Sequence, residues 1–123
     1  MLSGVQFEIP ITERINDMAR YVLIYSGDQT SPSRVEQDAI VADWEAWYEK
    51  MGDAIAEGGD PLGASKHISA VGAPAADGDG GMPASGYTVI DAASLEAAAA
   101  ACADHPHLNR GGKVHIFEAI DLH

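Results

Sequence analysis

The chain has little cysteine, little positive charge and no long apolar run, and each scarcity argues against a class of protein. Its single cysteine, Cys102, cannot form a disulfide within the chain, so a disulfide framework is excluded. Seven lysines and arginines against nineteen aspartates and glutamates give a net charge of −12, which repels phosphate backbones and makes nucleic acid an improbable partner. The alanine run at residues 97–101 is far short of a membrane span, so no membrane partner is expected.

What is present is typical of one folded domain. A chain of 123 residues, 46% hydrophobic and 21% charged, can bury a substantial core. Its first residues carry neither a basic n-region nor an apolar h-region, so we expect no secretory signal and a cytoplasmic location. Residues 1–18 differ in composition from the rest and are predicted to be an N-terminal arm, with a dimer contact as its first candidate role. The domain proper is expected over residues 19–123.

The stretch 86–108 combines the signals of a strand, a helix start and a helix stop. Residues 87–90 are β-formers, Asp91 and Ser94 offer N-cap oxygens, and the alanine-rich run after them favours a helix. Pro106 cannot continue that helix. His105 and His107 are therefore expected at its C-terminal end, where a helix favours the protonated imidazole.

Four further elements are predicted around this stretch. Residues 21–25 form the first strand, and a long amphipathic helix begins at the Ser33 capping box and ends at the glycines of residues 58–59. Residues 67–71 form the second strand, and the glycine-rich loop after it projects from a hairpin. Residues 113–120 form the last strand.

The resulting order, strand, helix, strand, strand, helix, strand, predicts an α+β fold of the ferredoxin-like βαββαβ kind. Two right-handed crossovers would build an antiparallel four-stranded sheet with two helices on one face. The other, apolar face would be bare in a monomer. A homodimer formed through that face, as a dimeric α/β barrel, is the expected solution.

Seven short segments carry a resemblance to a known family. They are RYVLIYSGD at 20–28, the paired tryptophans of the first helix, GDPLGASK at 59–66, SGYTVI at 85–90, SLEA at 94–97, PHL at 106–108 and GKVHIFE at 112–118. In this order and spacing, over residues 19–121, they resemble the YCII-related or DGPF domain family. The resemblance implies a ferredoxin-like dimeric α/β barrel with a cleft beside the sheet, and in most members no established function.

The chain departs from that family at two places. The loop before the third strand reads DGDGGMP at 77–83 where some members carry the Asp-Gly-Pro-Phe run. The resemblance also implies an acid–base dyad, made of a histidine in the first helix and an aspartate just before the proline that follows the second. Here the first histidine is His67, and His105 occupies the aspartate position. The dyad is therefore not preserved.

Two histidines flanking Pro106 are the first candidates for chemistry. His107 and His105 are candidates for general acid–base catalysis in a cleft, with Tyr25 as a substrate-binding neighbour. His107 is the stronger candidate because it lies in the matched PHL segment. The structural alternative is that both rings cap the last carbonyls of the helix or face water.

A second candidate group is Ser65, Lys66 and His67, which leads into a predicted strand. It would place a hydroxyl, an ammonium and an imidazole near the mouth of the cleft, where they would bind a carboxylate or polarise a carbonyl. The alternative is a solvated hairpin entry.

Three functions remain open from the residues alone. The first is an enzyme acting on a small polar metabolite in a dimer cleft. The second is a non-catalytic ligand-binding or assembly module, and the third, by fold analogy alone, is a cofactor-poor monooxygenase. No cofactor or metal is expected, because no His-x-x-x-His pair lies on a helix and Cys102 has no partner. Convergence of the candidate side chains in one pocket would favour the enzyme.

Overall fold

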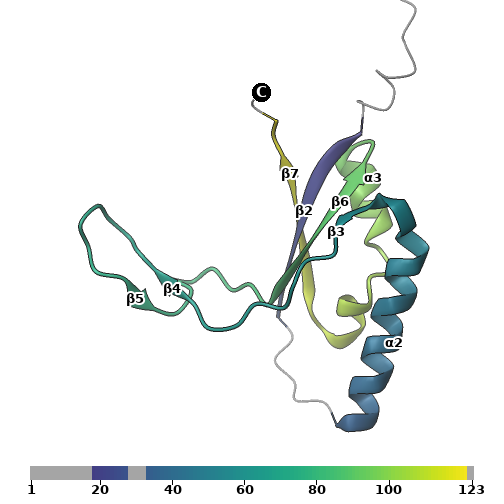
Figure 1. The fold of residues 1–123 in the computed structure, drawn as a ribbon, viewed down its shortest axis with the longest axis horizontal. Helices are drawn as coiled ribbons and strands as arrows, with labels where there is room; N and C mark the ends of the chain where they lie inside the picture. Colours follow the sequence, from purple (N-terminus) through teal and green to yellow (C-terminus); the bar gives the residue numbers. More distant parts are fainter. Residues whose placement is uncertain (1–17, 28–32, 122–123) are drawn as a thin grey trace, which may run out of the picture.

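The computed structural model of the chain describes residues 18–27 and 33–121. All but the last residue of the predicted N-terminal arm lies outside these described residues. The architecture is α+β: a four-stranded antiparallel sheet carries two helices on one face, and a hairpin projects from the side of the sheet opposite the helices (Figure 1).

The sheet has the strand order β3-β6-β2-β7. The central strands are β2 (Ala19–Ser26) and β6 (Gly86–Ala92), and the edges are β3 (Ile55–Glu57) and β7 (Lys113–Ala119). Every neighbouring pair is antiparallel. The predicted two-helix, four-stranded antiparallel arrangement is therefore confirmed, and the order is compatible with a ferredoxin-like fold.

The long helix α2 (Arg34–Met51) begins as predicted. Glu36 N donates to Ser33 Oγ at 3.2 Å, and Ser33 N donates to Glu36 Oε1 at 2.7 Å, which completes a capping box. The predicted end at residues 58–59 is wrong. The helix stops before Gly52, a short 3-10 turn η1 (Gly52–Ala54) follows, and Ile55 then pairs with Ile90 in the sheet. Strand pairing and burial overrode the helical spacing of Ile55.

The predicted second strand at residues 67–71 is also wrong. That region holds only the two-residue strand β4 (Lys66–His67), which pairs with β5 (Ala76–Asp77) in a small separate sheet. The second strand of the main sheet is β3. The hairpin itself projects from the body, as expected (Figure 1), and leaves Val71 fully exposed.

The second helix, α3 (Leu95–Ala101), begins at the predicted N-cap. Ala97 N donates to Ser94 Oγ at 3.0 Å. Asp91 does not cap the helix, because it stays within β6 opposite Arg20. A 3-10 helix, η2 (Pro106–Arg110), follows α3 and begins at the predicted proline.

The core lies between the sheet and the helices. Leu23 and Ile90 from the central strands are fully buried, and Ala98, Trp47 and Cys102 pack with them. Burial raises the pKa of the Cys102 thiol to about 11, so this cysteine is an unreactive core residue.

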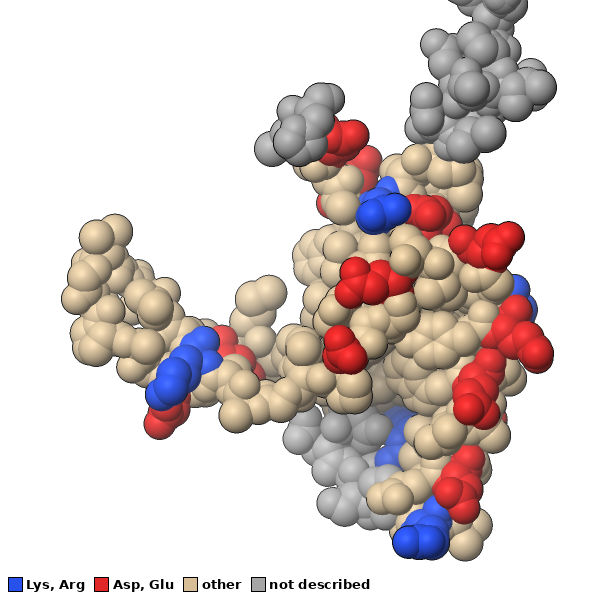
Figure 2. Space-filling model, in the orientation of Figure 1, with Lys and Arg blue, Asp and Glu red and all other residues tan. Residues whose placement is uncertain are grey.

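The opposite face of the sheet is open, with apolar side chains at its centre. Val22 pairs with Val89 on one side and Phe117 on the other. These positions alternate along the strands with the buried ones. Phe117 itself is 53% exposed. Acidic side chains instead lie along the exposed side of α2 (Figure 2). No helix among the described residues is long and apolar enough to cross a membrane.

Candidate functional site

A pocket of about 590 Å³ lies beside α2. Its walls come from α2, from the segment between β3 and the hairpin, from the start of β6 and from η2. The residues that line it include Tyr25, Trp44, Glu45, Tyr48, Asp60, Tyr87, His107 and Arg110. With Tyr25 of β2, the pocket thus collects residues from five separate parts of the chain.

Aromatic rings form the wall on the α2 side. Trp44 and Tyr48 are one turn apart, and their ring centroids lie 6.0 Å from each other. Trp44 also meets Tyr25 edge to face at 5.1 Å, a favoured geometry for aromatic pairs. The helix therefore presents a fixed apolar surface to the pocket.

His105 is fully buried behind this wall. Its ring lies 4.8 Å from the Tyr25 ring and 4.3 Å from the Trp47 ring, centroid to centroid. The backbone N–H of His107 donates to His105 Nδ1 at 3.0 Å. Because Nδ1 accepts, the neutral ring carries its proton on Nε2, which then donates to the Tyr25 hydroxyl at 3.0 Å.

The hydrogen bonds continue from Tyr25 in one direction. Its hydroxyl donates to Thr88 Oγ1 at 2.7 Å, and Thr88 donates to the Gly58 carbonyl at 3.2 Å. The Tyr48 hydroxyl reaches the same carbonyl at 2.8 Å. Within the described residues, no buried side-chain nitrogen or oxygen lacks a partner. This chain of bonds fixes Tyr25 and Tyr48 in position.

The protonation expected for His105 is wrong. Burial lowers the pKa of His105 to about 4, with a further lowering from the neighbouring His107. The proposed helix-end effect is outweighed because a charged imidazole would lose its hydration. A proton on Nδ1 would also point at the backbone N–H of His107, and the hydrogen bond between them would be lost. Burial likewise raises the pKa of Tyr25.

His107 has a different role because it lines the pocket. The Ser26 carbonyl lies 2.8 Å from Nε2, and since a carbonyl can only accept, Nε2 carries a proton. Gly112 leaves room for the ring, because a Cβ at that position would lie 2.2 Å from Nε2. Nδ1 has no hydrogen-bond partner among the described residues. The neutral ring thus keeps a lone pair on Nδ1.

The structure does not bring the second predicted group to this pocket. Ser65, Lys66 and His67 lie on the projecting hairpin, where Lys66 pairs with Asp77 at 2.6 Å. The Nδ1 of His67 lies 3.0 Å from the Gly78 carbonyl. None of the three lines the pocket, whereas His105, His107 and Tyr25 do come together.

Sequence reasoning missed the helix side of the site. Trp44 was noted only as one of the paired tryptophans of the first helix, yet it lines the pocket together with Tyr48. Thr88 was assigned only to a strand, yet it links Tyr25 to the Gly58 carbonyl. The four-residue spacing of Trp44 and Tyr48 was the one available signal.

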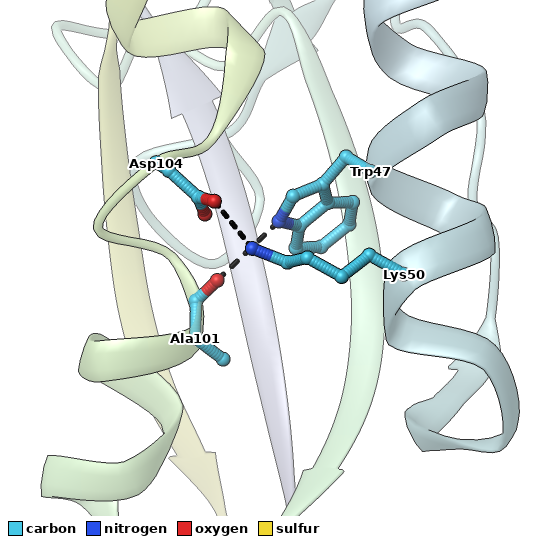
Figure 3. Close-up of polar contacts among 4 residues, drawn as sticks. All are labelled: Trp47, Lys50, Ala101 and Asp104. Atoms are coloured by element: carbon cyan, nitrogen blue, oxygen red, sulfur yellow. Dashed lines mark hydrogen bonds and ion pairs between the residues drawn. The ribbon is translucent and has the colours of Figure 1, made fainter.

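A polar cluster behind Trp47 has a structural role. Lys50 pairs with Asp104, and Trp47 Nε1 donates to the Ala101 carbonyl at 3.3 Å (Figure 3). The hydrogen bond from Lys50 lowers the pKa of Asp104. These contacts join α2 to the end of α3 and so hold the turn that carries His105. Within residues 18–27 and 33–121, no cluster of His, Cys, Asp and Glu could hold a metal ion.

Comparison with protein-family models finds no match for the chain, and comparison with curated proteins finds none either.

Proposed function

We propose that this protein is a YCII-related small-molecule enzyme in which His107 acts as the general base. The observation that carries the proposal is a pocket of about 590 Å³ lined by a histidine whose tautomer is set by a backbone carbonyl. A pocket of this size with an apolar wall and few polar groups is typical of a small-molecule site.

The tautomer gives His107 a defined direction of proton transfer. Nε2–H donates to the Ser26 carbonyl, so the lone pair on Nδ1 can accept a proton from a bound ligand. The imidazolium that forms would keep its bond to the carbonyl, which stabilises the positive charge. His105 does not react in this scheme. It receives the His107 N–H and so holds the backbone that carries the base.

The test is a screen of metabolites by NMR with the isotope-labelled full chain. Compounds that use the pocket should shift the indole N–H of Trp44 and the ring signals of His107, and Trp44→Ala should weaken their binding. His67→Ala, on the hairpin, is the matched control and should leave binding unchanged. A screen in which compounds bind at the hairpin, or in which none shifts the pocket signals, would overturn the proposal.

A non-catalytic binding module is the second candidate, and one observation favours it. His105, at the position of the family's implied aspartate, is fully buried and hydrogen-bonded at both nitrogens. Such a ring is suited to structural support. The variant His107→Gln distinguishes the two candidates. It should abolish turnover of a pocket ligand if the protein is an enzyme, and only alter the affinity for that ligand if it is a binding module.

The assembly we propose is a homodimer through the open sheet face. Val22, Val89 and the 53% exposed Phe117 supply its apolar surface. Sedimentation velocity should show a dimer for the wild type and a monomer for Phe117→Glu. Val71→Glu, on the exposed hairpin, is the control and should remain dimeric. A monomeric wild type would refute the assembly.

A further inference from the structure

The charges around the pocket are predominantly negative. Glu45 and Asp60 both line it, and neither belongs to an ion pair among the described residues. The nearby Tyr87 hydroxyl donates to Glu57 at 2.7 Å. This bond raises the pKa of Tyr87, and the charge of Asp60 adds to the effect. Two carboxylates thus line the pocket, Glu45 from α2 and Asp60 from the segment after β3.

Arg110, the basic residue of the wall within the described part of the chain, does not reverse this balance. Arg110 lies close enough to Glu36 to contribute to the lowered pKa of that carboxyl, after the larger effect of the hydrogen bonds from Ser33. The positive charge of Arg110 is therefore partly offset. The net charge of −12 on the whole chain adds a field that attracts cations to a low-dielectric hollow.

The aromatic wall suits the same kind of ligand. Trp44 and Tyr48 both line the pocket, and the faces of tryptophan and tyrosine rings attract ammonium groups electrostatically. Carboxylates on α2 and on the segment after β3, together with the aromatic faces, would attract a cation without requiring direct hydrogen bonds. This combination recognises alkylated amines, which expose methyl groups and a spread positive charge.

We infer that the pocket binds an organic cation of the alkylammonium class, held by the rings of Trp44 and Tyr48 together with the carboxylates of Glu45 and Asp60. The inference rests on the proposed function, since it names the ligand class of the same pocket. A ligand amine would also stand beside a histidine base. Where such a cation carries an N–H, transfer of that proton to His107 Nδ1 forms an N–H bond on the ring as the ligand's N–H bond breaks and leaves a neutral amine, so no further reactant is required.

Three probes of nearly equal shape test the charge preference: choline, the neutral 3,3-dimethylbutan-1-ol and the anionic 3,3-dimethylbutanoate. Each is titrated into the full chain at low ionic strength while the Trp44 indole signal is followed by NMR. Choline should bind roughly 10-fold more tightly than the neutral alcohol, as cation–π contacts and nearby carboxylates together allow. The anion should bind more weakly than either.

A matched pair of variants separates local charge from net charge. Glu45→Gln with Asp60→Asn removes the two pocket carboxylates, and the choline preference should fall to about twofold. Glu49→Gln with Asp53→Asn removes two charges from exposed residues that do not line the pocket, and it should keep the preference. Equal loss in both variants would show that only the overall field matters, which overturns the inference.

The outcomes also distinguish this inference from the function on which it rests. If the alcohol or the anion shifts the pocket signals as strongly as choline, the ligand class is wrong while the pocket remains a binding site. If no probe and no metabolite of the wider screen shifts those signals, the proposed function fails with it.

Discussion

Replacing Gly112 with alanine tests the placement of His107 directly. The added methyl would lie 2.2 Å from His107 Nε2 and 2.4 Å from Cδ2, well inside van der Waals contact. The ring cannot withdraw easily because Nε2 is bonded to the Ser26 carbonyl. Overpacking costs about 1–3 kcal/mol, and loss of that hydrogen bond adds about 1 kcal/mol. We expect Gly112→Ala to lower the free energy of unfolding by about 2–4 kcal/mol.

Urea denaturation at pH 7 measures this change, and Gly63→Ala is the matched control. Gly63 has an ordinary backbone conformation and open space around its missing Cβ, so its substitution should change stability by no more than about 0.5 kcal/mol. Adding His107→Ala to Gly112→Ala removes the clash, so the double variant should be more stable than the sum of the single effects predicts. A Gly112→Ala protein as stable as the Gly63 control, or strictly additive effects, would refute the position of the ring.

Four further substitutions test the surroundings of the site, each by urea denaturation. Tyr25→Phe leaves the buried His105 Nε2–H without its acceptor and should cost about 1–3 kcal/mol; a cost below about 0.5 kcal/mol would show that the bond is unimportant. The folded-state pKa of His105 is lowered to about 4 from about 6.5, so only the unfolded chain binds this proton between those pH values. The free energy of unfolding should therefore fall by about 2 kcal/mol as the pH drops through that window. His105→Asn should remove that part of the pH dependence, and an unchanged profile would contradict the lowered pKa. Ser94→Ala removes the cap of α3 and should cost about 1 kcal/mol, whereas a neutral effect would mean that α3 does not depend on its cap. Lys66→Ala breaks an exposed ion pair and should change stability by less than about 0.5 kcal/mol, so a larger loss would show that the hairpin supports the fold.

Local signals predicted most of the helices and strands. The Ser33 capping box, the Ser94 cap and Pro106 each mark an element boundary through contacts with residues a few positions away. Such boundaries can be derived from sequence because their energetics are local. The strands β2 and β6 were identified from their β-forming residues, and the structure buries their side chains at mostly alternate positions.

The second strand was misplaced because its signal is not local. Ile55 continues the helical spacing of α2, yet it pairs with Ile90, thirty-five positions later. Residues 67–71 have the composition of a strand but lie on a hairpin away from the sheet. Partner choice along a sheet edge depends on contacts between distant segments, which neither propensity nor periodicity reports.

The candidate site was predicted only in part for the same reason. His105, His107 and Tyr25 were named from the sequence, but their convergence depends on the packing of α2 against η2. The neutral state of His105 depends on complete burial, while the sequence shows only its place near a helix end. Ser65, Lys66 and His67 had an equally suggestive pattern, and the hairpin carries them away from the pocket.

The central claim is that His107 offers a free Nδ1 to a ligand in the pocket, and the imidazole nitrogen spectrum of the labelled protein tests it most directly. A two-bond ¹H–¹⁵N correlation at pH 7 should show the Nε2–H tautomer for the neutral form of His105 and His107. A bound pocket ligand should then move the His107 Nδ1 signal and leave both His105 nitrogens in place. An Nδ1–H tautomer for His107, or a saturating pocket ligand that leaves its nitrogens unmoved, would contradict the account.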